Sequence, residues 1–174
     1  PLSAAGVLPR VSQSEPTSSP PVLLVAGEGL SRYGFGDAHP FGLDRQEAFL
    51  RELRRSVVYP ELRQVEPRIA ERAEIEAFHH RDYVEFVQQR SAEGRGYLDA
   101  GDTPATRGIY EAASFVVGGT LLAVEEIMDR RARRGFIPIG GLHHAARTRA
   151  AGFCVFNDCG IAIVRRPEVL RAAM

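Results

Sequence analysis

Two adjacent histidines, His143 and His144, are the residues of this chain whose types and spacing point most directly to chemistry. They follow Gly140 and Gly141, which end a short apolar segment. In an open parallel sheet, ligands bind beyond the carboxyl ends of the strands. Imidazole titrates near neutral pH, so two imidazoles that face one cleft can share the roles of general acid and general base. A histidine pair without context is more often structural, but its position after a strand and two glycines makes a catalytic role equally compatible, and both interpretations stay open at this point.

The elements that must position this pair are predicted from apolar runs and from helical spacing. Strands are expected over residues 22–26, 62–65 and 136–139, and the first is typical of a buried strand in a parallel sheet. A loop is expected over 28–44. Helices are expected over 44–55, over 73–90 as one helix or a pair, from Thr103-Pro104 to about residue 134, and from Asn157 or Asp158 onward. Strands that alternate with helices predict an α/β domain with a parallel sheet.

Gly118 and Gly119 lie inside the longest expected helix. A glycine in a helix costs about 1 kcal/mol relative to alanine. The pair therefore indicates that another backbone packs closely against the helix there.

The composition excludes several classes of function. The chain has 174 residues, of which 44% are hydrophobic and 25% are charged, as in an ordinary soluble domain, and no apolar run is long enough for a membrane span. With 22 basic and 22 acidic residues, it lacks the positive charge typical of a nucleic-acid-binding protein. All the basic residues are arginine, which excludes a phosphate-loop or Schiff-base lysine within these residues. Cys154 and Cys159 form neither a disulfide framework nor a C-x-x-C pair, which favours a cytoplasmic location.

Two motifs resemble a known family. Gly140-Gly141-Leu142-His143-His144-Ala145, followed by Gly152-Phe153-Cys154-Val155-Phe156-Asn157-Asp158, resembles the histone deacetylase superfamily. The similarity is strongest to the bacterial branch that includes acetoin-utilisation proteins and acetylpolyamine amidohydrolases. Further resemblances occur in the family's order, over 33–40 with Arg45, over 78–79 and 83–87, and over 96–104. Together they span roughly residues 22–166.

The resemblance implies a three-layer α/β/α domain of the arginase–deacetylase type. Residues 22–174 would be its N-terminal part, after a mobile Pro- and Ser-rich tail over 1–21. Members of the family hydrolyse N-acyl amides with a zinc-bound water. The family's zinc ligands, an Asp-x-His pair and a later aspartate, are expected downstream of Met174. We therefore expect no metal ligand within residues 1–174, and no deacetylation by these residues alone.

The resemblance also implies roles for individual residues. His143 and His144 would be the catalytic pair, with His144 as the general base. Gly152 and Phe153 would form the wall of a narrow tunnel for the acyl-lysine chain, because an aromatic face suits methylene groups. Asp102 would bind the substrate backbone at the tunnel rim, although it could equally cap a helix.

Other positions receive different expectations. Arg45 resembles the arginine of the family's internal channel, and we expect it to point inward and to bond backbone carbonyls. His79 is expected to be structural and Cys154 to be a packing residue. In the first loop, Gly42-Leu43-Asp44 replaces the family's usual Lys-Pro pattern, which leaves the geometry of this loop open.

The expected partner is an acetylated small molecule, such as an acetylpolyamine, or an acetyl-lysine protein, with no nucleic acid and no membrane. The oligomeric state stays open. One alternative is a deacetylase-like domain that binds acylated ligands or partners without turnover. Another is a metallohydrolase of the arginase type, against which the block from His143 to Cys154 argues.

Overall fold

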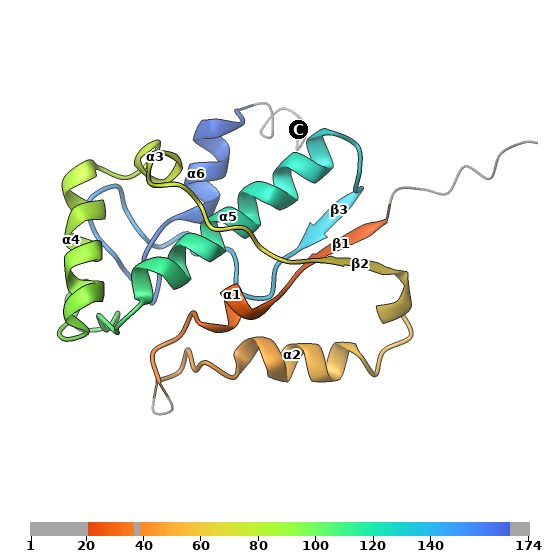
Figure 1. Ribbon diagram of the computed structural model, residues 1–174, viewed down its shortest axis with the longest axis horizontal. Coiled ribbons are helices and arrows are strands. Elements are labelled where there is room, and N and C mark those ends of the chain that lie inside the picture. Colours follow the sequence, from red (N-terminus) through yellow and green to blue (C-terminus); the bar gives the residue numbers. More distant parts are fainter. Residues whose placement is uncertain (1–20, 37–38, 168–174) are drawn as a thin grey trace, which may run out of the picture.

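The computed structural model describes residues 21–36 and 39–167, so nearly all of the tail expected over 1–21 lies outside the described residues (Figure 1). Three parallel strands form a sheet in the order β2-β1-β3. The strands are β1 (Val22–Val25), β2 (Leu62–Val65) and β3 (Arg134–Phe136). The helices are α1 (Glu28–Ser31), α2 (Arg45–Leu53), α3 (Arg72–Glu76), α4 (Arg81–Glu93), α5 (Ile109–Met128) and α6 (Asp158–Arg165), with a short 3-10 helix over Tyr59–Glu61.

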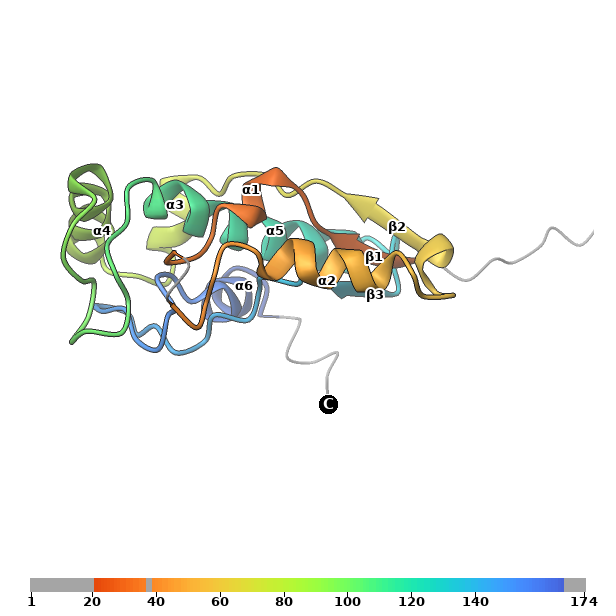
Figure 2. The ribbon, with the colours of Figure 1, turned by 90° about the horizontal axis from the view of Figure 1, so that it is seen from below.

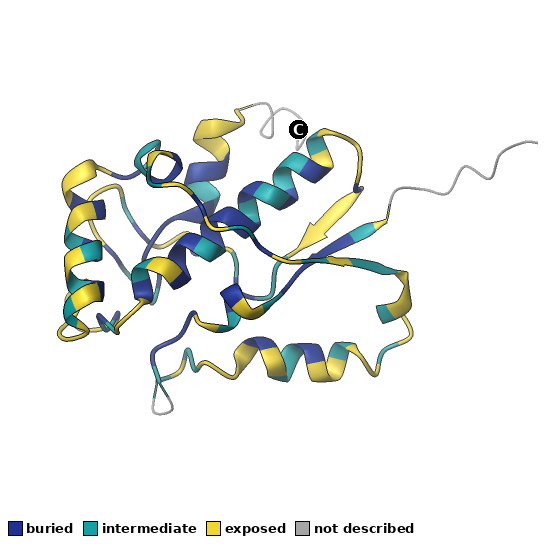
Figure 3. Cartoon of the chain, in the orientation of Figure 1, coloured by how far each residue is buried: buried dark blue, intermediate teal, exposed yellow. Residues whose placement is uncertain are grey.

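The central strand β1 is buried on both faces because its alternate side chains pack against different helices. Val25 faces α5, where its Cγ1 lies 3.2 Å from the position that a Cβ on Gly119 would occupy. Leu24 packs with Leu50 of α2 in a separate apolar cluster. Helices α2 and α5 accordingly lie on opposite sides of the strands, and β1 is largely buried whereas β3 is exposed (Figures 1 and 3). This arrangement confirms the α/β class with a parallel sheet.

The long helix α5 is crossed closely by the chain that follows β2. A Cβ added to Gly118 would lie 2.0 Å from the carbonyl oxygen of Arg68. Two residues later in the crossing chain, the amide of Ala70 donates a 3.0 Å hydrogen bond to the carbonyl of Ser114, about one turn earlier in α5. The close backbone approach predicted from the glycine pair is therefore confirmed. Neither α5 nor any other helix among the described residues is long and apolar enough to cross a membrane.

The third strand lies earlier in the chain than predicted. It covers Arg134–Phe136 instead of 136–139, and Phe136 pairs with Leu24 of β1. Pro138 has no N–H for a sheet hydrogen bond. Ile139 is buried in a turn beyond the strand, so its apolar character reflects the core and not a sheet.

The start predicted for the long helix at Thr103-Pro104 is also wrong. Pro104 forms an isolated antiparallel bridge with Tyr97, and the amide of Leu98 donates to the carbonyl of Thr103 over 2.8 Å. The helix begins only at Ile109, after Gly108 adopts a φ of 83°. The region 73–90 forms the pair α3 and α4, and α4 lies at the end of the molecule away from the strands in both views (Figures 1 and 2). The loop expected over 28–44 contains the short helix α1.

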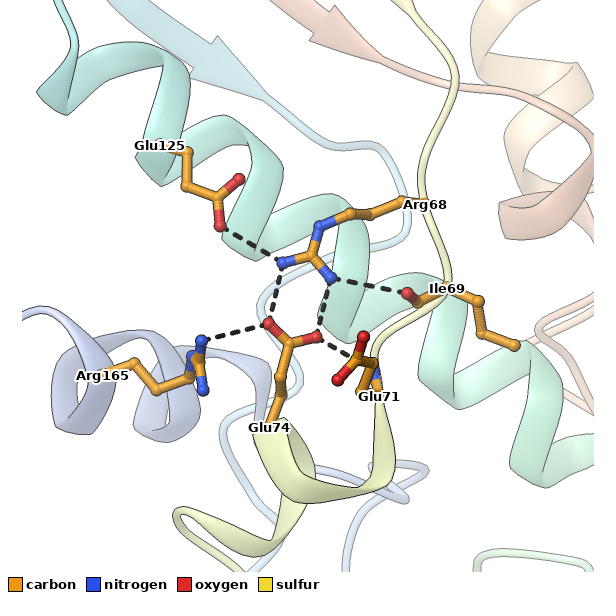
Figure 4. A network of polar contacts seen from close by, with 6 residues as sticks. All are labelled: Arg68, Ile69, Glu71, Glu74, Glu125 and Arg165. Atoms are coloured by element: carbon orange, nitrogen blue, oxygen red, sulfur yellow. Dashed lines mark hydrogen bonds and ion pairs between the residues drawn. The ribbon is translucent and has the colours of Figure 1, made fainter.

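An ionic network joins the chain after β2 to three helices (Figure 4). The Arg68 guanidinium donates to both carboxylate oxygens of Glu74, over 2.7 and 2.9 Å, and to Glu125 of α5 over 3.2 Å. Arg165 of α6 lies 3.2 Å from Glu74, whose side chain is only 9% exposed. The network therefore fixes α6 against α3 and α5.

We predict that Gly118→Ala lowers the free energy of unfolding of the full-length protein by about 2 kcal/mol or more, because its methyl group would overlap a backbone carbonyl. Gly119→Ala is the matched control. Its Cβ would meet only side-chain atoms, at 3.2 Å and beyond, so a loss below about 1 kcal/mol is expected. Chemical denaturation measures both variants, and equal losses would contradict the close crossing.

We also predict that Glu74→Gln lowers the free energy of unfolding by about 1–3 kcal/mol at neutral pH. Hydrogen bonds from Arg68 lower the pKa of Glu74 below its ordinary value of 4.5. The stabilisation by the carboxylate is therefore complete above that value and is lost as the pH falls through the lower folded pKa. The difference between wild type and variant, measured by denaturation at several pH values, should shrink in acid. Glu76→Gln, which breaks a more exposed pair with Arg72, should cost less than about 0.5 kcal/mol.

Candidate active site

The carboxylate of Asp158, at the start of α6, holds the loop that carries the two histidines. Asp158 is 1% exposed. Its Oδ1 accepts the amide of Leu142 over 2.7 Å, and its Oδ2 accepts the amide of Gly141 over 2.9 Å and the Thr120 hydroxyl over 2.6 Å. A buried carboxylate is tolerated where such donors replace water. The loop is thereby tied to both α5 and α6.

The side chain of Asn157 also holds this loop, through backbone carbonyls on either side of His144. Its side-chain oxygen accepts the amide of Gly160 over 2.7 Å and so caps α6, as the sequence predicts. Its Nδ2 donates to the carbonyls of His143 and Ala145, over 3.0 and 2.8 Å. The backbone on both sides of His144 is therefore held by one buried amide.

The structure brings the two imidazoles of His143 and His144 together in an exposed position. Their ring centroids lie 4.4 Å apart, with 36° between the ring planes. Nδ1 of His143 lies 2.9 Å from the carbonyl oxygen of Gly141. Because a carbonyl only accepts, this bond places a hydrogen on Nδ1 and leaves Nε2 of the neutral ring as the acceptor. The pair can therefore exchange protons with a bound molecule.

Gly152 and Phe153 lie beside this pair. A Cβ on Gly152 would be 3.3 Å from Cγ of His144, and the φ of Gly152 is 52°. Phe153 itself has a φ of 69°, a region that non-glycine residues rarely adopt. The Tyr33 hydroxyl donates to the carbonyl of Phe153 over 2.6 Å, and the amide of Phe153 donates to the Thr103 hydroxyl over 3.2 Å. These bonds hold the strained turn.

The loop of Asp102 faces the same region. Nε2 of His39 lies 3.1 Å from the carbonyl oxygen of Asp102, and the His39 ring meets the Phe153 ring edge to face with centroids 4.6 Å apart. Asp99 organises this loop, since its Oδ1 accepts the amides of Gly101, Asp102 and Thr103 over 2.8–3.0 Å. Asp102 does not cap α5, which begins at Ile109.

A hollow of about 280 Å³ separates the segment Asp99–Asp102 from the segment Arg149–Gly152. Gly152 borders this hollow on one side and the ring of His144 on the other. The structure thus places five predicted site residues in one region, namely Asp102, His143, His144, Gly152 and Phe153.

The sixth predicted residue, Arg45, does not point inward in the structure. It is exposed at the start of α2, and its guanidinium carbon lies 4.5 Å from the centre of the Phe41 ring. A cation over an aromatic face is a stable arrangement that needs no backbone carbonyls. The expected inward orientation is therefore wrong for the described residues, and the channel role of Arg45 stays an untested prediction.

Sequence reasoning gave no site role to three residues that shape this region: Tyr33, Thr103 and His39. Tyr33 and its partner Phe153 are separated by 120 positions, and no local pattern reveals such a contact.

His79 supports the site from below the surface. Burial lowers its pKa to about 4, so it is neutral at pH 7, and its Nε2 accepts the amide of Asn157 over 2.9 Å. Burial raises the pKa of Cys154, which makes this residue a poor nucleophile.

The described side chains of this region do not supply a metal-binding group. Within 21–36 and 39–167, no three His, Cys, Asp or Glu residues form a group that could hold a metal ion. The carboxylate of Asp158 is already surrounded by three hydrogen-bond donors. The described residues therefore do not fit a zinc site.

Comparisons with known proteins support the resemblance. The model of the histone deacetylase domain matches residues 39–171. The chain is 38% identical over 138 residues to acetoin utilization protein AcuC of Bacillus subtilis (strain 168), covering 75% of this chain and 36% of that protein. It is 37% identical over 115 residues to histone deacetylase 8 of Xenopus tropicalis, covering 62% and 31%, respectively.

A third relative is acetoin utilization protein AcuC of Staphylococcus aureus (strain MSSA476), with 32% identity over 144 residues, 79% of this chain and 37% of that protein. The chain thus spans about a third of the length of these relatives. The family match accords with the parallel sheet covered by helices and confirms the arginase–deacetylase fold class. On the matched residues and these relatives, the chain belongs to the histone deacetylase family.

Proposed function

We propose that the full-length protein is a hydrolase that removes acetyl groups from N-acetylated amines. The observation that carries the proposal is the imidazole pair of His143 and His144, with ring centroids 4.4 Å apart on a loop fixed by Asn157 and Asp158. Family membership supports the same activity. Amide hydrolysis needs a proton removed from water and a proton given to the leaving amine. Two adjacent imidazoles supply both functions.

His144 is the general base in this proposal and takes the proton of the attacking water. His143 stabilises the developing charge or protonates the leaving amine. The hydrogen bond from Nδ1 of His143 to Gly141 directs its Nε2 as the atom that exchanges the proton.

The substrate chain would run beside Gly152 and Phe153. The absence of a side chain on Gly152 leaves space next to the His144 ring, where a Cβ would lie 3.3 Å from Cγ. Phe153 would contact methylene groups, and Asp102 would accept N–H groups of the substrate at the rim. These roles follow from the family resemblance and are supported by the position of Asp102 and Gly152 at one hollow, with Phe153 next to Gly152 in the chain.

Zinc remains part of the proposal on the strength of family membership alone. Its ligands would come from residues of the full-length protein other than those described. A cytoplasmic location and an acetylated protein or small molecule as partner are likewise proposals. Arg45 is retained as a candidate for the internal channel, although its side chain is exposed in the structure.

We predict that His144→Ala lowers kcat of the full-length protein by a factor of order 10²–10⁴, because a general base is lost. The assay uses an acetyl-lysine peptide and an acetylated polyamine. His80→Ala is the matched control, since His80 is exposed and its side chain does not cap α4. Its turnover should equal that of wild type.

A His144→Ala variant that retains most of the activity would contradict the assigned base. A wild-type protein that binds these acetylated compounds but never hydrolyses them would favour the alternative of an acyl-binding domain without turnover.

A further inference from the structure

The hollow beside the imidazole pair carries two unpaired charges of opposite sign. It is bounded by Asp99–Asp102 on one side and by Arg149–Gly152 on the other, and its volume is about 280 Å³. Asp102 and Arg149 are both exposed. Neither the carboxylate of Asp102 nor the guanidinium of Arg149 has a hydrogen-bond or ion-pair partner among the residues that the structure describes. A hollow of this size is slightly below the usual range of small-molecule pockets.

The neighbouring charged groups are already engaged, which sets these two apart. The Asp99 carboxylate accepts hydrogen bonds from three backbone amides and from the Thr103 hydroxyl. Arg147, in the same loop as Arg149, donates to the carbonyl of Phe78 over 2.8 Å and lies over the Phe78 ring. Asp102 and Arg149 are therefore the charges available to a ligand in this hollow.

The backbone that carries Arg149 is held in place. The amide of Ala146 donates to the carbonyl of Arg149 over 2.9 Å, which closes a tight turn. On the other side, Ala151 and Cys154 form an antiparallel bridge, with the Cys154 amide donating over 2.9 Å. Arg149 thus lies on a fixed segment between the imidazole pair and Phe153. A fixed backbone limits the ordering that a ligand must impose on binding.

We propose that Arg149 and Asp102 select acetylated substrates whose α-carbon carries both a free carboxylate and an N–H group, which describes Nε-acetyl-lysine as a free amino acid or at a peptide C-terminus. A guanidinium binds a carboxylate through two parallel hydrogen bonds, and a carboxylate accepts from an N–H group. The acetylated end of the side chain would then extend past Gly152 toward His144. An acetylpolyamine lacks the carboxylate that the Arg149 guanidinium would bind. This inference rests on the proposed function.

The test compares four substrates with the full-length protein: Nε-acetyl-lysine, its α-carboxamide, Nα,Nε-diacetyl-lysine as the free acid, and an acetylated polyamine. Wild type should prefer the free acids to the carboxamide. Arg149→Gln should lower kcat/KM about five- to tenfold for the free acids and leave the carboxamide unchanged. Arg149→Lys should retain part of the preference, and Arg55→Gln, an exposed change beyond α2, should alter nothing. The diacetylated acid represents a peptide C-terminus, because its α-nitrogen is acylated, whereas free Nε-acetyl-lysine has an α-ammonium group. Comparing the two compounds distinguishes a preference for the free amino acid from a preference for a peptide C-terminus.

Two results would overturn the inference while leaving the proposed function intact: equal turnover of acid and carboxamide by wild type, or an equal loss on both in Arg149→Gln. If no compound is hydrolysed, the proposed function fails and calorimetry decides the inference separately. Tighter binding of the acid than of the carboxamide, lost in Arg149→Gln, supports the selection, and equal binding refutes it.

Discussion

The carboxylate of Asp158 is buried in the first turn of α6. A buried carboxylate is stable only where hydrogen-bond donors surround it. Three donors do so here, two from the backbone after Gly140 and one from Thr120 in α5. Asp158 also lies at a helix N-terminus, where negative charge is favoured. The need to satisfy one buried charge thereby fixes where the histidine loop leaves the core.

Contacts elsewhere in the molecule position the elements that carry Asp158 and its three donors. β1 is buried between α2 and α5, and the segment after β2 crosses α5 at Gly118. The Arg68–Glu74 pair then fixes α6 through Arg165, so that α5 and α6 meet where Asp158 and Thr120 bond. Neutral His79 adds a further bond to the amide of Asn157. Stability and site geometry are therefore carried by the same buried polar groups.

Local patterns were sufficient to predict β1, the close approach at the glycine pair and the imidazole pair, because each is marked by a few consecutive residues of the sequence. They were insufficient where packing in three dimensions decides the outcome. The apolar residue Ile139 lies in a buried turn, and Pro104 pairs with Tyr97 before α5 begins. Arg45 lies over Phe41, and Phe153 takes its strained backbone from bonds to Tyr33 and Thr103. The two bonds of Phe153 join residues 120 and 50 positions apart in the chain, which no short motif records.

The central claim, that the Asp158 carboxylate orders the histidine loop, is tested most directly by amide hydrogen exchange in the full-length Asp158→Asn variant. The loss of an acceptor should reduce protection of the Gly141 and Leu142 amides by at least about tenfold, while the amides of α5 stay protected. Asp129→Asn, which changes an exposed partner of Arg131, is the control and should leave both regions unchanged. Unaltered protection at Gly141 and Leu142, or an equal loss throughout α5, would contradict a local clamp.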